Sequence, residues 1–258
     1  MPFIEVIHKV WIPDLPEIDL PYEDGVPLES HWHRLQINLL NEVLEQYWHA
    51  RDDFFAGGNM FIYYSMAQVR NRDYKGPDFF VVQGVERSRS RRSWIVWDEG
   101  GRYPDVIVEL LSPTTAAEDL GPKKDLYEQV FRTAEYFCVN PDGYTLQGWR
   151  LTGAHYVPIP LNTEGQVWSE RLQLWLGFEA GSFQGTPDNW VQFFDPVGRR
   201  LPTGAERADT ERAMAEAERA MAAAARKRAE AERERAEAAL AENAHLRAEL
   251  ERLQRRES

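Results

Sequence analysis

The sequence predicts an α/β or α+β fold, with a mixed sheet flanked by helices and one long C-terminal helix. Short segments rich in aromatic and β-branched residues alternate with helical stretches, and all nine tryptophans lie before position 191. From residue 205 onward there is no glycine, proline or aromatic residue. With 258 residues the chain is long enough to bury a full core. We therefore expect a globular domain at residues 1–203 and a helical tail at 204–258.

Within the globular part, apolar residues at helical spacing from Leu35 to Tyr47 predict a first helix at about 31–49. A second helix is expected at 122–132, because Gly121-Pro122 is typical of a helix start. The predicted strands lie at 60–66, 78–83, 94–97, 105–111, 135–139, 144–150 and 154–158. Strands, a crossing helix and further strands together indicate the mixed sheet.

The tail consists mainly of alanine, glutamate and arginine, which favour helix. Its heptad positions are apolar only near the end, at Leu246, Leu250 and Leu253, and they hold alanine and glutamate elsewhere. Two alternatives remain open: a solvated single helix, or a weak coiled coil that joins two copies of the chain through residues 204–258. In the second case Asn243 in the seam favours a low oligomer number.

The net charge of −12 excludes a protein that coats nucleic acid or membranes non-specifically. Up to Thr203 there are 29 acidic and 18 basic residues, so almost all of this charge belongs to the globular part. The one cysteine, Cys138, excludes an intrachain disulfide framework and is predicted to lie in the core. The N-terminus does not resemble a signal peptide, and no apolar run is long enough to span a membrane. We therefore expect a cytoplasmic protein without a membrane partner.

Two acidic residues accompany apolar strands. Asp78 precedes one of them, and Glu109 lies inside another, on the face that it shares with Asp105, Ile107 and Leu111. An unpaired carboxylate there is costly, so Glu109 needs a cation, a metal or a proton. Asp105 is about 13 Å away along the strand, whereas Asp78 on a neighbouring strand forms a plausible ligand pair for Mg²⁺ or Mn²⁺. In the alternative reading, Asp78 caps a turn and Glu109 pairs with an arginine.

The second predicted helix carries Asp119, Lys123 and Tyr127 at intervals of four, which places them on one face. Lys123 then points toward the strand ends, while Lys124 is turned by about 100° and is the weaker candidate. Asp119 precedes the proline, so its alternative role is only to cap the helix. The neighbouring apolar stripe, expected to pack on the sheet, consists of Leu126, Val130 and Phe131.

These motifs resemble the Uma-two family, which are restriction-endonuclease-like proteins of the PD-(D/E)XK superfamily. The resemblance covers about residues 20–180 and depends on Pro77-Asp78, on the string from Asp105 through Glu109 to Ser112-Pro113, and on Asp119 with Lys123 and Tyr127. It implies a restriction-endonuclease-like sheet and a Mg²⁺- or Mn²⁺-dependent endonuclease that hydrolyses phosphodiester bonds of nucleic acid. DNA is the expected substrate, and RNA is the alternative.

The resemblance also implies roles for single residues. Asp78 and Glu109 would bind the metal ion. The superfamily normally places its lysine two residues after the glutamate, where this chain has Leu111, and Lys123 matches a migrated catalytic lysine. An acid on or before the first helix often completes such a site, and the candidates are Glu23, Glu29, Glu42 and Glu45.

Other motifs have several readings. The basic cluster Arg87, Arg89, Arg91 and Arg92 is either the phosphate contact of a nuclease or a solvated turn. The segment His31-Trp32-His33 is expected to cap and pack, and Ser112-Pro113-Thr114-Thr115 to end a strand and cap a helix. The rival to an enzyme is a non-catalytic scaffold of the same fold that acts through its tail, since the acidic globular part repels phosphate backbones.

Overall fold

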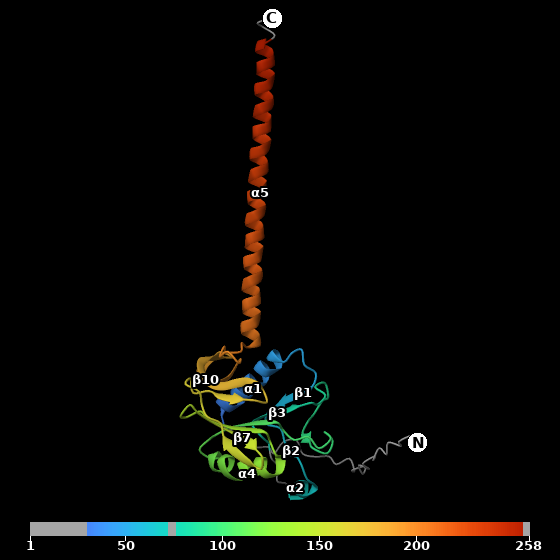
Figure 1. Ribbon diagram of the computed structural model, residues 1–258, viewed down its shortest axis with the longest axis vertical. Helices are drawn as coiled ribbons and strands as arrows, with labels where there is room; N and C mark the ends of the chain where they lie inside the picture. The colour runs from blue at the N-terminus through green and yellow to red at the C-terminus, as the bar shows by residue number, and fades with distance from the viewer. Residues whose placement is uncertain (1–29, 72–75, 255–258) are drawn as a thin grey trace, which may run out of the picture. The chain divides into compact units, whose positions relative to one another are not determined.

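The computed structural model describes residues 30–71 and 76–254 (Figure 1). The chain divides into two compact units, with the boundary between Leu201 and Pro202. Within the described part of the chain, no helix is long and apolar enough to cross a membrane.

The first unit is built on a six-stranded sheet in the order β1-β3-β5-β6-β7-β8. β5 and β6 run parallel, and the other neighbouring strands are antiparallel. The strands are β1 (Phe54–Gly57), β3 (Phe79–Gln83), β5 (Val106–Leu110), β6 (Glu135–Asn140), β7 (Thr145–Thr152) and β8 (His155–Pro158). This mixed sheet with its helices confirms the predicted fold class. Of these strands, β1 has no counterpart among the predicted elements.

Two smaller sheets complete the unit. β2 (Ile62–Tyr63) pairs in parallel with β4 (Trp94–Ile95), and the short helix α2 (Met66–Asn71) follows β2. An antiparallel sheet of three strands contains β9 (Val167–Ser169), β10 (Leu174–Phe183) and β11 (Thr186–Phe194). No predicted element covers this second sheet. The second half of β10 is exposed at residues 179–182 and contains Gly181, so its apolar signal is weak.

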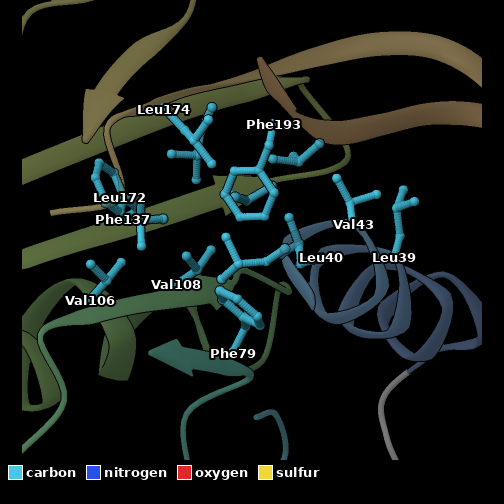
Figure 2. Close-up of a cluster of buried hydrophobic side chains, with 14 of the residues drawn as sticks. Leu39, Leu40, Val43, Phe79, Val106, Val108, Phe137, Leu172, Leu174 and Phe193 are labelled. Atoms are coloured by element: carbon cyan, nitrogen blue, oxygen red, sulfur yellow. The ribbon is translucent and has the colours of Figure 1, made fainter. Parts of the chain in front are cut away.

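Helix α1 (His31–Tyr47) begins at Ser30, whose Oγ accepts a hydrogen bond from the His33 N–H at 3.2 Å. Its apolar face, which includes Leu39, Leu40 and Val43, packs on the buried face of the sheet (Figure 2). The helix ends two residues before the predicted end, with Trp48 as its C-terminal cap.

Side chains of β5 alternate between two hydrophobic cores. Val106, Val108 and Leu110 belong to the core that α1 covers, whereas Ile107 belongs to the core on the opposite face. This alternation was predicted, and it places Glu109 on the same face as Ile107. Cys138 of β6 is buried in that second core, as expected.

The second predicted helix begins earlier than expected. Alternating α- and π-helical turns run through α3 (Ala116–Glu118), η1 (Asp119–Lys123), α4 (Lys124–Leu126) and η2 (Tyr127–Phe131). Pro122 lies inside η1 rather than at the start of the helical segment. The segment ends at Arg132, which has a φ of 57°.

The prediction that Val130 packs on the sheet is wrong, since it is 46% exposed. Leu126 and Phe131 do pack against the second core. The π-turns change the angle between successive side chains, so a periodicity of 3.6 residues misplaces one member of the stripe.

The second unit is dominated by α5 (Gly204–Gln254), a single helix of 51 residues, which confirms the predicted long C-terminal helix. Thr203 and Glu206 form a capping box at its start. The Glu206 N–H donates to Thr203 Oγ1 at 3.3 Å, and the Thr203 N–H donates to Glu206 Oε2 at 2.8 Å. Met214, Met221 and Leu240 are exposed along this helix.

Candidate active site

Asp78 lies at the start of β3 and contacts the end of β5. Its Oδ2 accepts a hydrogen bond from the Leu110 N–H at 2.7 Å, and its own N–H donates to Glu109 Oε2 at 3.1 Å. Because β3 and β5 are antiparallel, with Phe79 opposite Val108, the start of one strand meets the end of the other. The two predicted metal-binding acids are therefore adjacent, although they are far apart in the sequence.

The Glu109 carboxylate is buried on the face of the sheet that the 116–131 helical segment covers. Its Oε1 accepts a hydrogen bond from the Tyr127 hydroxyl at 2.9 Å and lies 3.3 Å from Lys123 Nζ. Its cationic partner is thus Lys123, and not the arginine that the alternative reading supposed. The helix and both strands meet at this carboxylate.

Lys123 also pairs with a third acid, Asp119, whose Oδ1 lies 2.8 Å from Nζ. Asp119 is buried, so it does more than cap the helix, and its signal in the sequence was the four-residue spacing to Lys123 and Tyr127. The Lys123 side chain is 16% exposed, so it is not completely enclosed by the protein. Lys124 turns away, and its ammonium lies 4.2 Å from the ring centroid of Trp149.

The cluster holds an excess of negative charge. Burial raises the pKa of Asp78 to about 6, and burial together with the charges of Asp78 and Asp119 raises the pKa of Glu109 to about 8. Burial by itself lowers the pKa of Lys123, but Glu109 and Asp119 reverse this, so the ammonium stays protonated. Burial raises the pKa of the Tyr127 hydroxyl well above its usual value, so this group remains a hydrogen-bond donor.

The chemistry of these groups fits a hydrated divalent cation. Asp78 and Glu109 supply adjacent carboxyl oxygens, the ligands that Mg²⁺ and Mn²⁺ prefer. In residues 30–71 and 76–254, no group of three or more His, Cys, Asp or Glu side chains is placed to hold a metal ion together. Mg²⁺ usually binds through one or two carboxylates and completes its shell with water and substrate phosphate.

Asp105 and the arginine cluster lie toward the other end of the strands. Asp105 Oδ2 accepts a hydrogen bond from the Gln83 N–H at 2.8 Å, where β3 ends. Asp78 is separated from Gln83 by about 16 Å of extended chain. The arginine loop follows Gln83, so it begins at the end of β3 that is remote from Asp78 and Glu109.

The arginines are largely engaged within the protein. Arg91 donates to both carboxylate oxygens of Glu99, at 2.8 and 3.0 Å, and its side chain is only 2% exposed. Arg89 lies 3.3 Å from the same glutamate, and Arg87 pairs with Glu45. Of the four, Arg89 and Arg92 are exposed at the residue level. The structure therefore forms no continuous patch of four open guanidinium groups.

None of the four acids suggested for completing the site is found in the acid cluster of the described residues. Glu23 and Glu29 lie outside the described residues. Glu45 is paired with Arg87 near the arginine loop, away from the acid cluster. Glu42 lies in the same half of α1 as Glu45, far from the helix start that reaches β5. The acid that the structure adds to the cluster is Asp119.

The start of α1 reaches the end of β5 through His33. Its Nε2 lies 3.2 Å from the Leu110 carbonyl oxygen, so Nε2 donates, and Nδ1 accepts from Ser30 Oγ at 2.7 Å. His31 contacts Arg34 instead, so the two histidines do not form one site. The predicted cap and packing role of His33 is confirmed, and its contact with Leu110 lies beside the acid cluster.

Comparisons with known proteins give one family model and a similar solved structure. A family model described as "Uma2: Putative restriction endonuclease" matches residues 11–181, a span that contains the acid cluster. No curated protein matches the chain. A solved structure described as a putative nuclease belonging to DUF820 from Anabaena variabilis is 16% identical, with a TM-score of 0.41, over 61% of this chain and 86% of that chain.

Proposed function

This chain belongs to the Uma2 family, and we propose that it is a metal-dependent endonuclease that hydrolyses phosphodiester bonds of DNA in the cytoplasm. The observation that carries the proposal is the convergence of Asp78, Glu109 and Lys123 from three separate segments. A buried and a half-buried carboxylate beside a protonated ammonium suit a cation and a phosphate group, and a purely structural role does not require this excess of acid.

Asp78 and Glu109 are the residues that would hold Mg²⁺ or Mn²⁺. When bound, the ion supplies activation of a water molecule and neutralisation of charge on the phosphate. Hydrolysis then adds the water oxygen to phosphorus, breaks one P–O bond and leaves the proton on the departing oxygen. Because the Lys123 ammonium stays protonated, it orients the attacking water or supports charge on the phosphate oxygens, and it does not act as a base.

Tyr127 and Asp119 contact the proposed catalytic residues and not the substrate. The Tyr127 hydroxyl fixes Glu109 Oε1, and Asp119 holds the Lys123 ammonium in position. Both are positioning residues in this proposal. Their contacts explain why the lysine can lie on a helix, fourteen residues beyond the glutamate, and still reach its carboxylate.

Cleavage of supercoiled plasmid by the full chain tests the proposal. We expect cutting with Mg²⁺ or Mn²⁺ and none with EDTA, and we expect Asp78→Asn and Glu109→Gln to abolish it. Asp105→Asn is the matched control, because it removes a carboxylate from the same strand but outside the cluster. A parallel reaction on single-stranded RNA tests the choice of DNA. Cutting that survives both cluster variants would contradict the assignment.

The rival function is a non-catalytic scaffold that acts through α5. Its support is the acidic globular part together with an arginine loop whose Arg87 and Arg91 are already paired with acids. Calorimetric titration with Mn²⁺ separates the two functions. Saturable binding that is lost in Glu109→Gln favours the enzyme, whereas the absence of any binding in the wild type favours the scaffold.

We also propose that α5 joins two copies of the chain. Its exposed Met214, Met221, Leu240 and Leu246 support this, because a helix of 51 residues leaves them open to solvent when alone. Light scattering of the full chain should give a dimer mass, and Leu246→Glu should shift it toward the monomer. A monomer mass in the wild type at high concentration would refute the dimer.

A further inference from the structure

A cavity of about 760 Å³ lies where β5 and β6 end. Its volume is within the range of ligand pockets. The lining residues that matter here are Trp32, His33, Ser112, Asp142, Tyr144 and Asp188. None of these residues has a role in the proposed hydrolysis.

The backbone of Leu110 connects this cavity to the acid cluster. Its N–H donates to Asp78 Oδ2 at 2.7 Å, while its carbonyl oxygen accepts from Nε2 of His33, a residue of the cavity wall, at 3.2 Å. Ser112 is three residues beyond Glu109, which is about 10 Å of extended chain. A group bound in the cavity is therefore within reach of a phosphodiester held at the cluster.

The charge of the cavity identifies the kind of group that fits. Among the described residues that line it there is no lysine or arginine, whereas two aspartates, Asp142 and Asp188, belong to the lining. Two carboxylates repel a phosphate, but they accept hydrogen bonds from N–H groups. The cavity thus suits a neutral group that presents N–H donors.

Aromatic rings add a preference for a flat group. Trp32 is stacked on Trp190, with ring centroids 5.9 Å apart and an interplanar angle of 3°. Tyr144 is half exposed, and its ring packs edge-on against Phe178 at 5.6 Å. Rings held in place by other rings offer a stacking surface at little cost in conformational entropy.

We infer that this cavity binds an unpaired base of the nucleic acid strand that is cut, with guanine preferred. Guanine carries two adjacent N–H donors, on N1 and N2, which match the two oxygens of one carboxylate. Asp142 is the better recognition residue, since it is exposed, whereas Asp188 Oδ1 already accepts from the Asn189 N–H at 2.7 Å. The inference rests on the proposed nuclease function, because it makes the substrate a strand with an unpaired base.

Binding without cleavage tests the inference. Fluorescence anisotropy of the full chain, with Ca²⁺ in place of Mg²⁺, compares labelled oligothymidylates that carry one central guanine, inosine or abasic site. We expect the guanine strand to bind roughly ten-fold more tightly than the inosine strand, which lacks the N2 amino group, and the abasic strand to bind most weakly. Asp142→Asn should remove the preference of guanine over inosine, and Asp125→Asn, an exposed acid outside the cavity, should keep it.

Equal binding of the three strands by the wild type would overturn the inference and leave the nuclease proposal standing. A guanine preference that persists in Asp142→Asn would also overturn it. If the wild type binds none of the strands while Mn²⁺ binds saturably, the cavity does not take a base. If neither strands nor Mn²⁺ bind, both proposals fail.

Discussion

Two buried glutamates on neighbouring strands of one sheet have opposite surroundings. Glu135, the first residue of β6, is enclosed by donors: Arg150 Nε at 3.0 Å, the Glu170 N–H at 2.8 Å, the Arg171 N–H at 3.2 Å and the Ser169 hydroxyl. These contacts connect β6 to β7 and to the turn that follows β9. All four groups are hydrogen-bond donors to the Glu135 carboxylate.

Glu109, near the end of β5, has a lysine and a tyrosine but also two acidic neighbours. Lys123 is shared with Asp119, and Asp78 lies directly beside the carboxylate. Both glutamates are buried to the same degree, so burial does not distinguish them. The two glutamates differ instead in the charges of the groups around them. Glu135 is satisfied by the protein alone, whereas the surroundings of Glu109 retain an excess of negative charge that suits a cation.

The largest expected effects are opposite for these two residues: a variant of Glu109 should lose cleavage activity, and a variant of Glu135 should lose stability. Glu109→Gln should reduce cleavage at least 1,000-fold. It should change the free energy of unfolding by less than about 1 kcal/mol, since burial and the charges of Asp78 and Asp119 already disfavour the charged form of Glu109. Glu135→Ala should lower the free energy of unfolding by about 3–5 kcal/mol, because Arg150 and two backbone N–H groups lose their acceptor.

Urea denaturation and plasmid cleavage, measured on the same preparations of both variants, check these opposite effects. Below its unfolding transition, Glu135→Ala should cut at a rate within about three-fold of the wild type, because Glu135 contacts none of the proposed catalytic groups. A large loss of stability in Glu109→Gln, equal to that in Glu135→Ala, would remove the distinction between a functional and a structural glutamate.

Lys123, the cation beside Glu109, can be compared with its neighbour Lys124, which faces away from the cluster. Lys123→Met should reduce cleavage by about 100- to 1,000-fold, because the proposed function assigns its ammonium to the phosphate or the attacking water. Lys124→Met is the matched control on the next residue. It loses the contact with Trp149 and a favourable charge near Glu128, so we expect cleavage within about two-fold and a stability cost of about 0.5–1 kcal/mol. Equal losses of cleavage in the two variants would argue against a catalytic role for Lys123.

The smallest expected effect concerns Cys138, which lies opposite Glu109 in the parallel register of β5 and β6. Burial raises the pKa of its thiol, so at pH 8.5 the group stays protonated, whereas an exposed cysteine is about half thiolate. Iodoacetamide should therefore leave native protein unmodified over an hour and alkylate it fully in urea. Mass spectrometry measures the difference. Rapid modification of the native protein would show that this end of the sheet opens.

Particular residues show how far sequence patterns reach. The alternation from Val106 to Leu110, the apolar face of α1 and the uninterrupted tail helix were all predicted, because each depends on a local period of two or 3.6 residues. The start of the second helix was misplaced at Gly121-Pro122, since a local rule for proline does not anticipate a π-turn. The hairpin of β10 and β11 was missed because its exposed half lacks an apolar pattern.

For the candidate site, the residue types at Asp78, Glu109 and Lys123 could be selected from the sequence, since a carboxylate within an apolar strand requires a partner. The resemblance to the family also implied that the lysine comes from outside its usual position, where this chain has Leu111. The sequence could not show which of the two buried glutamates, Glu109 or Glu135, has acidic neighbours. It also could not show that Asp119 rather than Glu45 joins the acid cluster. Nor could it show that Arg91 is buried against Glu99. These choices depend on contacts between residues far apart in the chain. Such contacts arise only when strands pair and helices pack, and no local periodicity records them.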